Sequence, residues 1–138
     1  MRIMGLDIGT KNIGVAVSDE TCTLAQSREV IRRKSIEQVV SRIKELLEKF
    51  KVEEIVVGLP INMNGTEGEK AAESRKWADM LKEKLAVSVY LWDERLSTRE
   101  AENIMISGNV SRKKRKVSID KLAAQIILQG YLDSLKRE

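Results

Sequence analysis

The chain has 138 residues and 42% hydrophobic content, which fits a single domain covering residues 1–138. It has no histidine and one cysteine, which excludes serine–histidine and cysteine–histidine catalysis, a cysteine-based zinc site and an internal disulfide. Because it shows no apolar run of membrane-spanning length and no recognisable secretory signal, we expect a cytoplasmic protein without membrane contact.

Positive charge is concentrated in one part of the chain. Lys and Arg number 25, and Asp and Glu number 21. Five basic residues form one unbroken run, and the 20 others are balanced by the 21 acidic residues; the run consists of Arg112, Lys113, Lys114, Arg115 and Lys116. A dense basic run favours polyanions, whose binding releases condensed counterions, so we expect it to contact nucleic-acid phosphates. The alternative is a solvated loop without a ligand.

The first third of the chain predicts a hairpin followed by a third strand. Residues 2–8 predict a strand that places Asp7 on the opposite face from its apolar neighbours Leu6 and Ile8. The turn at 9–12 leads into a second strand with alternating apolar residues. Residues 23–31 predict a third strand, polar enough to lie near a sheet edge.

The remaining elements alternate between helix and strand. Ser35 followed by Gln38 is a capping box that opens a helix, and the apolar run 54–59 is typical of a strand inside a sheet. After a loop at 62–68, we expect helix 69–85, strand 87–92 and a short helix ending at Gly108; they are followed by a basic loop at 112–116 and a final helix capped by Ser118. This order predicts an α/β fold with a mixed five-stranded sheet, an antiparallel hairpin plus parallel strands, flanked by helices.

Carboxylates are the groups left for catalysis, and Asp7 is the first candidate. Hard oxygen ligands select Mg²⁺ or Mn²⁺, the ions of phosphoryl chemistry. Asp7 lies near the end of an apolar strand, where a buried carboxylate is costly unless it sits at the mouth of the sheet or binds a cation. The alternative is an Asp that only starts the following turn.

Two further acidic positions can converge with Asp7. Asp93 and Glu94 end the last strand, and at most one of them can share the face of Asp7; the adjacent Arg95 can orient a carboxylate or hold a phosphate. Asp120 leads the small, apolar face of the final helix. The alternatives are a surface ion pair at Glu94 and a helix-dipole preference at Asp120.

Four segments together resemble the motifs of the YqgF family, in the family's order and over nearly the whole chain. They are GLDIGTKNIGVAVSD at 5–19, VGLP at 57–60 followed by Gly65, DERLST at 93–98 and DKLAAQIIL at 120–128. Members of this family are described as pre-16S ribosomal RNA nucleases and, in older usage, as Holliday junction resolvases. The resemblance implies a ribonuclease H-like fold in a bacterial cytoplasmic protein.

The resemblance also implies a metal site and a reaction. Asp7, Glu94 and Asp120 would be the catalytic, metal-binding acids for Mg²⁺ or Mn²⁺. Many ribonuclease H-like relatives carry their second acid on the central strand; strand 55–59 here has none, and Glu94 would replace it. The expected reaction is phosphodiester hydrolysis near the 5′ end of precursor 16S ribosomal RNA, either free or within the ribosome. The expected protein is a monomer or weak homodimer. Lys11 and Arg95 would hold phosphates beside the metal, with residues 112–116 gripping the backbone farther out.

Three other functions are compatible with the same residues. A Holliday junction resolvase would act on four-way, branched DNA, generally as a symmetric dimer. The segment at 5–10 also resembles the phosphate loop of the actin and sugar-kinase superfamily, although those proteins pair two such domains around ATP. A non-catalytic ribosome-assembly factor that binds nucleic acid would use the same basic surface.

Overall fold

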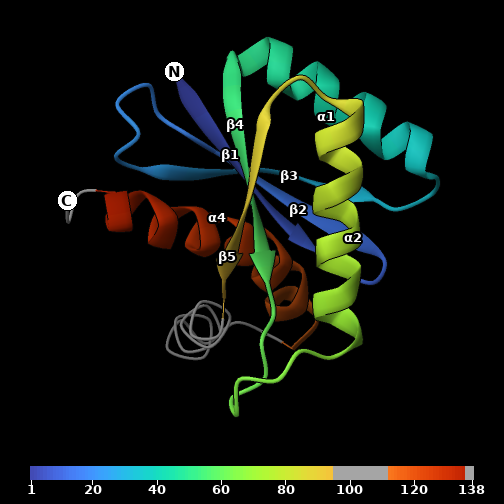
Figure 1. Ribbon diagram of the computed structural model, residues 1–138. Helices are drawn as coiled ribbons and strands as arrows, with labels where there is room; N and C mark the ends of the chain where they lie inside the picture. Colours follow the sequence, from blue (N-terminus) through green and yellow to red (C-terminus); the bar gives the residue numbers. More distant parts are fainter. Residues whose placement is uncertain (95–111, 136–138) are drawn as a thin grey trace.

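A five-stranded sheet forms the centre of the computed structural model (Figure 1). The structure describes residues 1–94 and 112–135, and it describes the side chains of all these residues except 112–121. The strands are β1 (Arg2–Ile8), β2 (Asn12–Ser18), β3 (Ala25–Arg32), β4 (Val52–Leu59) and β5 (Ser88–Asp93), in the order β3-β2-β1-β4-β5. The pairs β1/β2 and β2/β3 are antiparallel, whereas β1/β4 and β4/β5 are parallel. The predicted mixed sheet is therefore confirmed.

Sequence patterns explain the positions of the strands. β1, β2 and β4 are largely buried and occupy the interior of the sheet, as their apolar content requires. β3 alternates exposed and more buried residues and lies at one edge, as its polarity predicts. The hairpin between β1 and β2 pairs Asp7 with Gly14, so no side chain lies directly across from this carboxylate.

Two of the described helices cover one face of the sheet. α1 (Ile36–Phe50) begins after Ser35, whose hydroxyl accepts the Gln38 N–H at 3.2 Å, and this confirms the predicted cap. α2 (Glu69–Lys84) follows the loop after β4. Both helices bury apolar side chains in a core with β1, β2 and β4; its members include Met4, Leu6, Ile43, Val57, Trp77 and Leu81.

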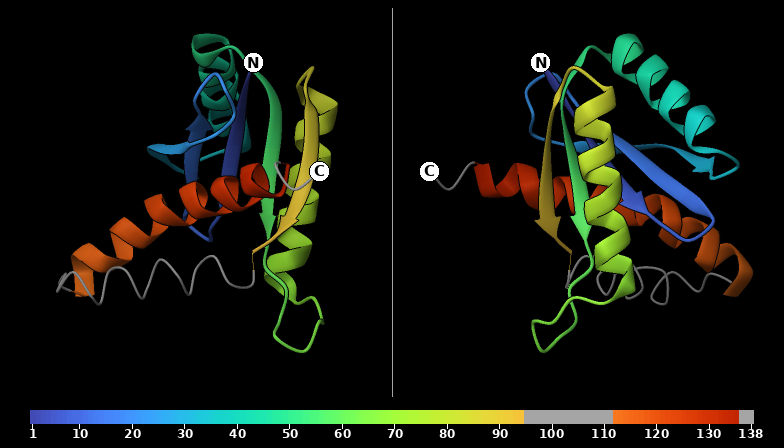
Figure 2. Two further views of the ribbon diagram at one scale, coloured as in Figure 1. Left: turned by 90° about the vertical axis from the view of Figure 1, so that its left-hand side faces the viewer. Right: turned by 45° about the vertical axis from the view of Figure 1, so that its right-hand side comes forward.

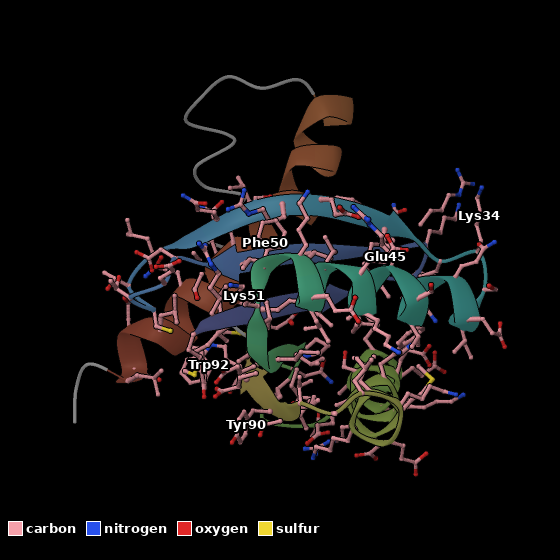
Figure 3. All side chains as sticks on the ribbon, turned by 90° about the horizontal axis from the view of Figure 1, so that it is seen from above. Lys34, Glu45, Phe50, Lys51, Tyr90 and Trp92 are labelled. Carbon is pink, nitrogen blue, oxygen red and sulfur yellow. The ribbon has the colours of Figure 1, made fainter. Side chains whose placement is uncertain are left out.

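Among the described residues, one helix, α4 (Arg112–Leu135), crosses the opposite face of the sheet (Figure 2). Its described side chains form a second, smaller core with the strands, consisting of Ile3, Ala16, Ala25, Val56, Ala124, Ile127, Leu128 and Leu132. Near its end, the Tyr131 hydroxyl donates to Glu54 Oε1 at 2.5 Å, and its ring lies edge-on to Trp92. Tyr90 and Trp92, which share one face of β5, thus pack toward Tyr131 of α4 (Figure 3).

The start of α4 corrects two expectations from the sequence. We expected a loop at 112–116 and a cap at Ser118, but α4 already begins at Arg112. Lys and Arg are good helix formers, and no Gly or Pro occurs between Arg112 and Gly130. An N-cap serine contributes only about 1 kcal/mol, so the helix propensity of the basic run outweighs it. The expected short helix ending at Gly108 lies outside the described residues.

No helix in the described part of the chain is long and apolar enough to cross a bilayer.

Candidate active site

Asp7 and Glu94 reach the same edge of the sheet from two strands. Asp7 is the last residue but one of β1, and Glu94 directly follows β5. The Glu94 N–H donates to the Leu59 carbonyl at 3.1 Å, which continues the pairing of β5 with β4 by one residue. Because β1, β4 and β5 run parallel, both acids lie at the carboxyl ends of the two strands that flank β4, where α/β proteins usually place their sites.

Both side chains lie on the face of the sheet that α4 covers. A Cβ built on Gly5, two residues before Asp7, would lie 2.7 Å from Leu128 Cβ of α4. A Cβ built on Gly58 would collide with Glu94 Oε2 and lie 2.5 Å from Ile127 Cδ1. The Glu94 side chain therefore lies against the backbone of Gly58, which has no side chain, on the side covered by α4. Of the two adjacent acids, Glu94 is the one that shares the face of Asp7, and we refer to these two residues as the carboxylate pair.

The Glu94 carboxyl is electrostatically unusual. Its Oε2 atom is buried and has no hydrogen-bond partner among the described residues. Burial, together with the negative charges of Asp7 and Asp93, raises the pKa of Glu94 to about 8, while Lys70 acts in the opposite direction. A buried carboxylate oxygen facing a second carboxylate is costly unless a proton or a cation compensates it. The carboxylate pair therefore fits a hard divalent cation such as Mg²⁺ or Mn²⁺.

For Asp120, the third expected acid, only the position of its helix is described. Tyr131 of α4 contacts Glu54 near the start of β4, whereas Ile127, one turn earlier, lies against Gly58 near the end of that strand. α4 thus approaches the carboxylate edge toward its N-terminus, and Asp120 lies about two turns before Ile127. The side chain of Asp120 is outside the described residues, and the described side chains contain no group of three metal-binding acids.

The expected phosphate-binding residues are placed to different degrees. Lys11 is exposed in the β1–β2 turn, which the Gly9 N–H closes by donating to the Asn12 carbonyl at 2.9 Å. A Cβ on Gly9 would lie 2.5 Å from that carbonyl oxygen, so the tight turn requires glycine. Arg95 lies outside the described residues, as do the side chains of Arg112, Lys113, Lys114, Arg115 and Lys116, whose backbone forms the first turns of α4.

Sequence reasoning missed two residues that shape the site. Gly58 was noted only as part of a motif, yet its missing side chain makes room for Glu94. Lys70, in the first turn of α2, acts electrostatically on Glu94. A glycine inside an apolar strand signals close approach of another group and could have identified Gly58. No local signal identifies Lys70, because the route of the preceding loop decides its position.

Comparisons with known proteins identify the family to which the chain is similar. The family model described as "RuvX: Holliday junction resolvase" matches residues 1–134. A protein of Halothermothrix orenii is 55% identical over 133 residues, 96% of this chain and 95% of that protein, and carries the name "Putative pre-16S rRNA nuclease". A Bacillus cytotoxicus protein of the same name is 52% identical over 136 residues, 97% of this chain and 99% of that protein.

A solved structure supports the fold independently of close sequence similarity. Thermus thermophilus RuvC in complex with a Holliday junction substrate superposes with a TM-score of 0.59 at 19% identity, over 99% of this chain and 96% of that one. This likeness confirms the ribonuclease H-like fold that the sequence motifs imply. Together with the match over residues 1–134, it leads to one conclusion: the chain belongs to the RuvX family, the YqgF family of the sequence resemblance.

Proposed function

We propose that this protein is a metal-dependent nuclease that hydrolyses phosphodiester bonds of precursor 16S ribosomal RNA during ribosome biogenesis in the cytoplasm. The observation that carries the proposal is the carboxylate pair, in which Glu94 Oε2 is buried without a hydrogen-bond partner among the described residues and Glu94 lies within the electrostatic reach of Asp7 at the carboxyl edge of the sheet. The names of relatives that are 55% and 52% identical support ribosomal RNA as the substrate.

The carboxylate pair would hold the divalent ion, with Asp120 as the third ligand. When bound, Mg²⁺ or Mn²⁺ supplies an activated water and stabilises the leaving oxygen. Asp7 and Glu94 would contribute negative charge at a fixed place, since Asp7 lies within β1, Glu94 directly follows β5, and both strands pair with β4. Gly58 keeps side-chain atoms out of the space that Glu94 occupies.

Basic groups around the carboxylate pair would position the substrate. Lys11 is exposed in the turn that follows Asp7, and Arg95 follows Glu94 in the sequence. The basic run at 112–116 forms the start of α4, where the helix dipole adds further positive potential. An anionic backbone is the partner that such a helix start favours. These residues would thus hold phosphates on either side of the bond to be cut.

A second candidate is resolution of four-way DNA junctions by the same carboxylates. The description of the matched family and the junction complex of the Thermus thermophilus RuvC favour it. Two matched cuts require a symmetric dimer, so this candidate predicts a dimer in solution, whereas ribosomal RNA processing is compatible with a monomer or weak homodimer. Sedimentation with and without a four-way junction distinguishes them, because a protein that stays monomeric on the junction contradicts the resolvase.

Replacement of Asp7 tests the nuclease directly. We expect Asp7→Asn to lower the rate of Mg²⁺-dependent cleavage of a precursor 16S ribosomal RNA fragment roughly 100-fold or more, because it removes one charge of the carboxylate pair. Gel analysis of end-labelled RNA gives the rate. Asp79→Asn, a matched change at an exposed acid of α2, should leave cleavage unchanged.

Two outcomes would contradict the proposal. Equal cleavage by wild type and Asp7→Asn would assign the activity to a contaminant. RNA binding without any Mg²⁺-dependent cleavage by the wild type would instead support the alternative of a non-catalytic ribosome-assembly factor.

A further inference from the structure

Three exposed basic side chains gather where the β1–β2 turn meets the end of β3. Lys11 lies in the turn, Arg32 ends β3 opposite Asn12 of β2, and Lys34 follows two residues later. All three side chains are exposed, and Lys34 lies far from Tyr90 and Trp92 of β5 (Figure 3). We call these three residues the basic strip.

The charges of the basic strip are not neutralised by described carboxylates. None of its members forms an ion pair among residues 1–94 or the described side chains of α4, whereas four other arginines do; these are Arg2, Arg33, Arg42 and Arg75. The run of three basic residues at 32–34 is thus divided, with the central arginine bound to Glu73 and the outer two exposed. Unneutralised cations side by side repel one another and favour an anionic partner.

Arg33 builds the scaffold that holds the basic strip in place. Its backbone N–H donates to the Lys11 carbonyl at 2.9 Å, and its guanidinium donates to the Gly9 carbonyl at 2.7 Å. The same guanidinium reaches Glu73 of α2 at 2.6 Å and lies 5.2 Å from the ring centre of Trp77. Arg33 therefore ties the turn after Asp7 to both β3 and α2.

The local backbone separates the inward arginine from its outward neighbours. The Lys34 N–H donates to the Arg32 carbonyl at 3.0 Å, which closes a three-residue turn around Arg33. The Arg33 side chain, in the middle of this turn, is hydrogen-bonded to the Gly9 carbonyl, whereas the flanking side chains of Arg32 and Lys34 are exposed.

Two members of the basic strip, Lys11 and Arg32, lie close to the carboxylate pair. Ile31 packs in the core beneath α1 and α2, so Arg32, the next residue, lies on the α4 face that also carries Asp7. Gly14 of β2 pairs with both Asp7 and Val30, and Arg32 is two residues beyond Val30. Strand spacing and rise then place the backbone of Arg32 roughly 12 Å from that of Asp7.

We infer that the basic strip binds phosphates of the substrate strand beside the bond to be cut, on the β3 side of the carboxylate pair. The inference rests on the proposed function and extends it, because it assigns Arg32 and Lys34 to the binding of a single-stranded nucleic-acid backbone. Lysine and arginine at this spacing contact phosphates and carry no base specificity, so RNA sequence should matter little here.

The double variant Arg32→Gln/Lys34→Gln tests the inference and leaves Lys11 intact. In an Asp7→Asn background, which keeps the RNA uncut, the slope of log affinity for a labelled single-stranded RNA against log salt should shrink by roughly 1.4. Lys82→Gln/Lys84→Gln, in the last turn of α2, removes the same charge and should leave the slope unchanged. With Asp7 present, the KM for cleavage should rise several-fold at an unchanged kcat.

The outcomes separate this inference from the proposed function. If the wild type cleaves RNA but the double variant shows an unchanged slope, the inference about the basic strip is overturned and the proposed nuclease function is not. If the double variant shows a reduced slope but the wild type never cleaves RNA, the inference about the basic strip is supported and the proposed nuclease function is overturned. If thermal unfolding shows that the double variant is not folded, Lys34→Gln alone should shrink the slope by about 0.7, and no change would overturn the inference.

Discussion

The protonation of Glu94 links the candidate site to the stability of the fold. An isolated carboxyl of this kind ionises with a pKa of 4.5, but burial and the adjacent acids raise the pKa of Glu94 to about 8. Between these two values, the folded metal-free protein holds a proton that the unfolded chain has already released. The free energy of unfolding therefore falls as the pH rises through this window, and the contribution of Glu94 becomes constant above it.

We predict that Glu94→Gln flattens this pH dependence. In the presence of a chelator, the Tm of the wild type should fall more steeply between about pH 5 and pH 8 than that of Glu94→Gln, which carries no titrating group at this position. Scanning calorimetry across the range measures both slopes. Glu53→Gln, a change at an exposed acid of β4, should retain the wild-type slope. Parallel curves for wild type and Glu94→Gln would show that burial does not hold this proton.

Among the elements, the contact between β4 and α4 controls the space available to Glu94. Gly58 lies between Glu94 and Ile127, and nothing larger than its hydrogen fits without displacing one of them. Ile127 is fully buried in the smaller core, so the Glu94 carboxylate is the group that can move. The separation of this strand and this helix is thus coupled to the geometry of the carboxylate pair.

We expect Gly58→Ala to damage both stability and activity. Overpacking should cost roughly 1–3 kcal/mol in the free energy of unfolding, measured by urea denaturation. Displacement of Glu94 should also raise the Mg²⁺ concentration for half-maximal cleavage. Gly130→Ala tests a second contact of α4, where the added Cβ would lie 3.1 Å from Trp92 Nε1 and away from the carboxylates. An equal change in Mg²⁺ dependence for both variants would contradict the specific role of Gly58.

The elements show why some features could be predicted from sequence. The β1–β2 hairpin and the Ser35 cap depend on local chemistry, and both are confirmed. The parity of strand residues also indicated that one of Asp93 and Glu94 shares the face of Asp7. The predicted start of α4 was wrong because the N-cap preference of Ser118 competed with the helix propensity of the basic residues before it. The role of Gly58 depends on how closely α4 packs on the sheet, which no local pattern records.

At the scale of the whole molecule, positive charge is unevenly distributed. The net charge is +4, and the basic run 112–116 contributes five positive charges at one helix start. The first turns of α4 project beyond the sheet (Figure 2). Positive charge on a projecting element can contact an anionic backbone outside the carboxylate edge without blocking it.

We predict that neutralising residues 112–116 shrinks the salt dependence of RNA binding. Replacement of all five by Gln should reduce the slope of log affinity against log salt by roughly 3.5 for single-stranded RNA if every one contacts a phosphate, since each lost phosphate contact contributes about 0.7. Gln retains helix propensity, so circular dichroism should show an unchanged helix content. Filter binding at several salt concentrations gives the slope. An unchanged slope would remove the start of α4 from the interface.

The strand order has a consequence for the newly made protein. β1 is synthesised before its parallel partner β4, and Glu94 follows β5, the last of the described strands in the sequence. A nascent chain that ends before β5 holds Asp7 without Glu94, so the carboxylate pair forms only after β5 has been synthesised. An enzyme that cuts ribosomal RNA would therefore lack one of its two carboxylates, and stay inactive toward the ribosome that makes it, until all five described strands have been synthesised.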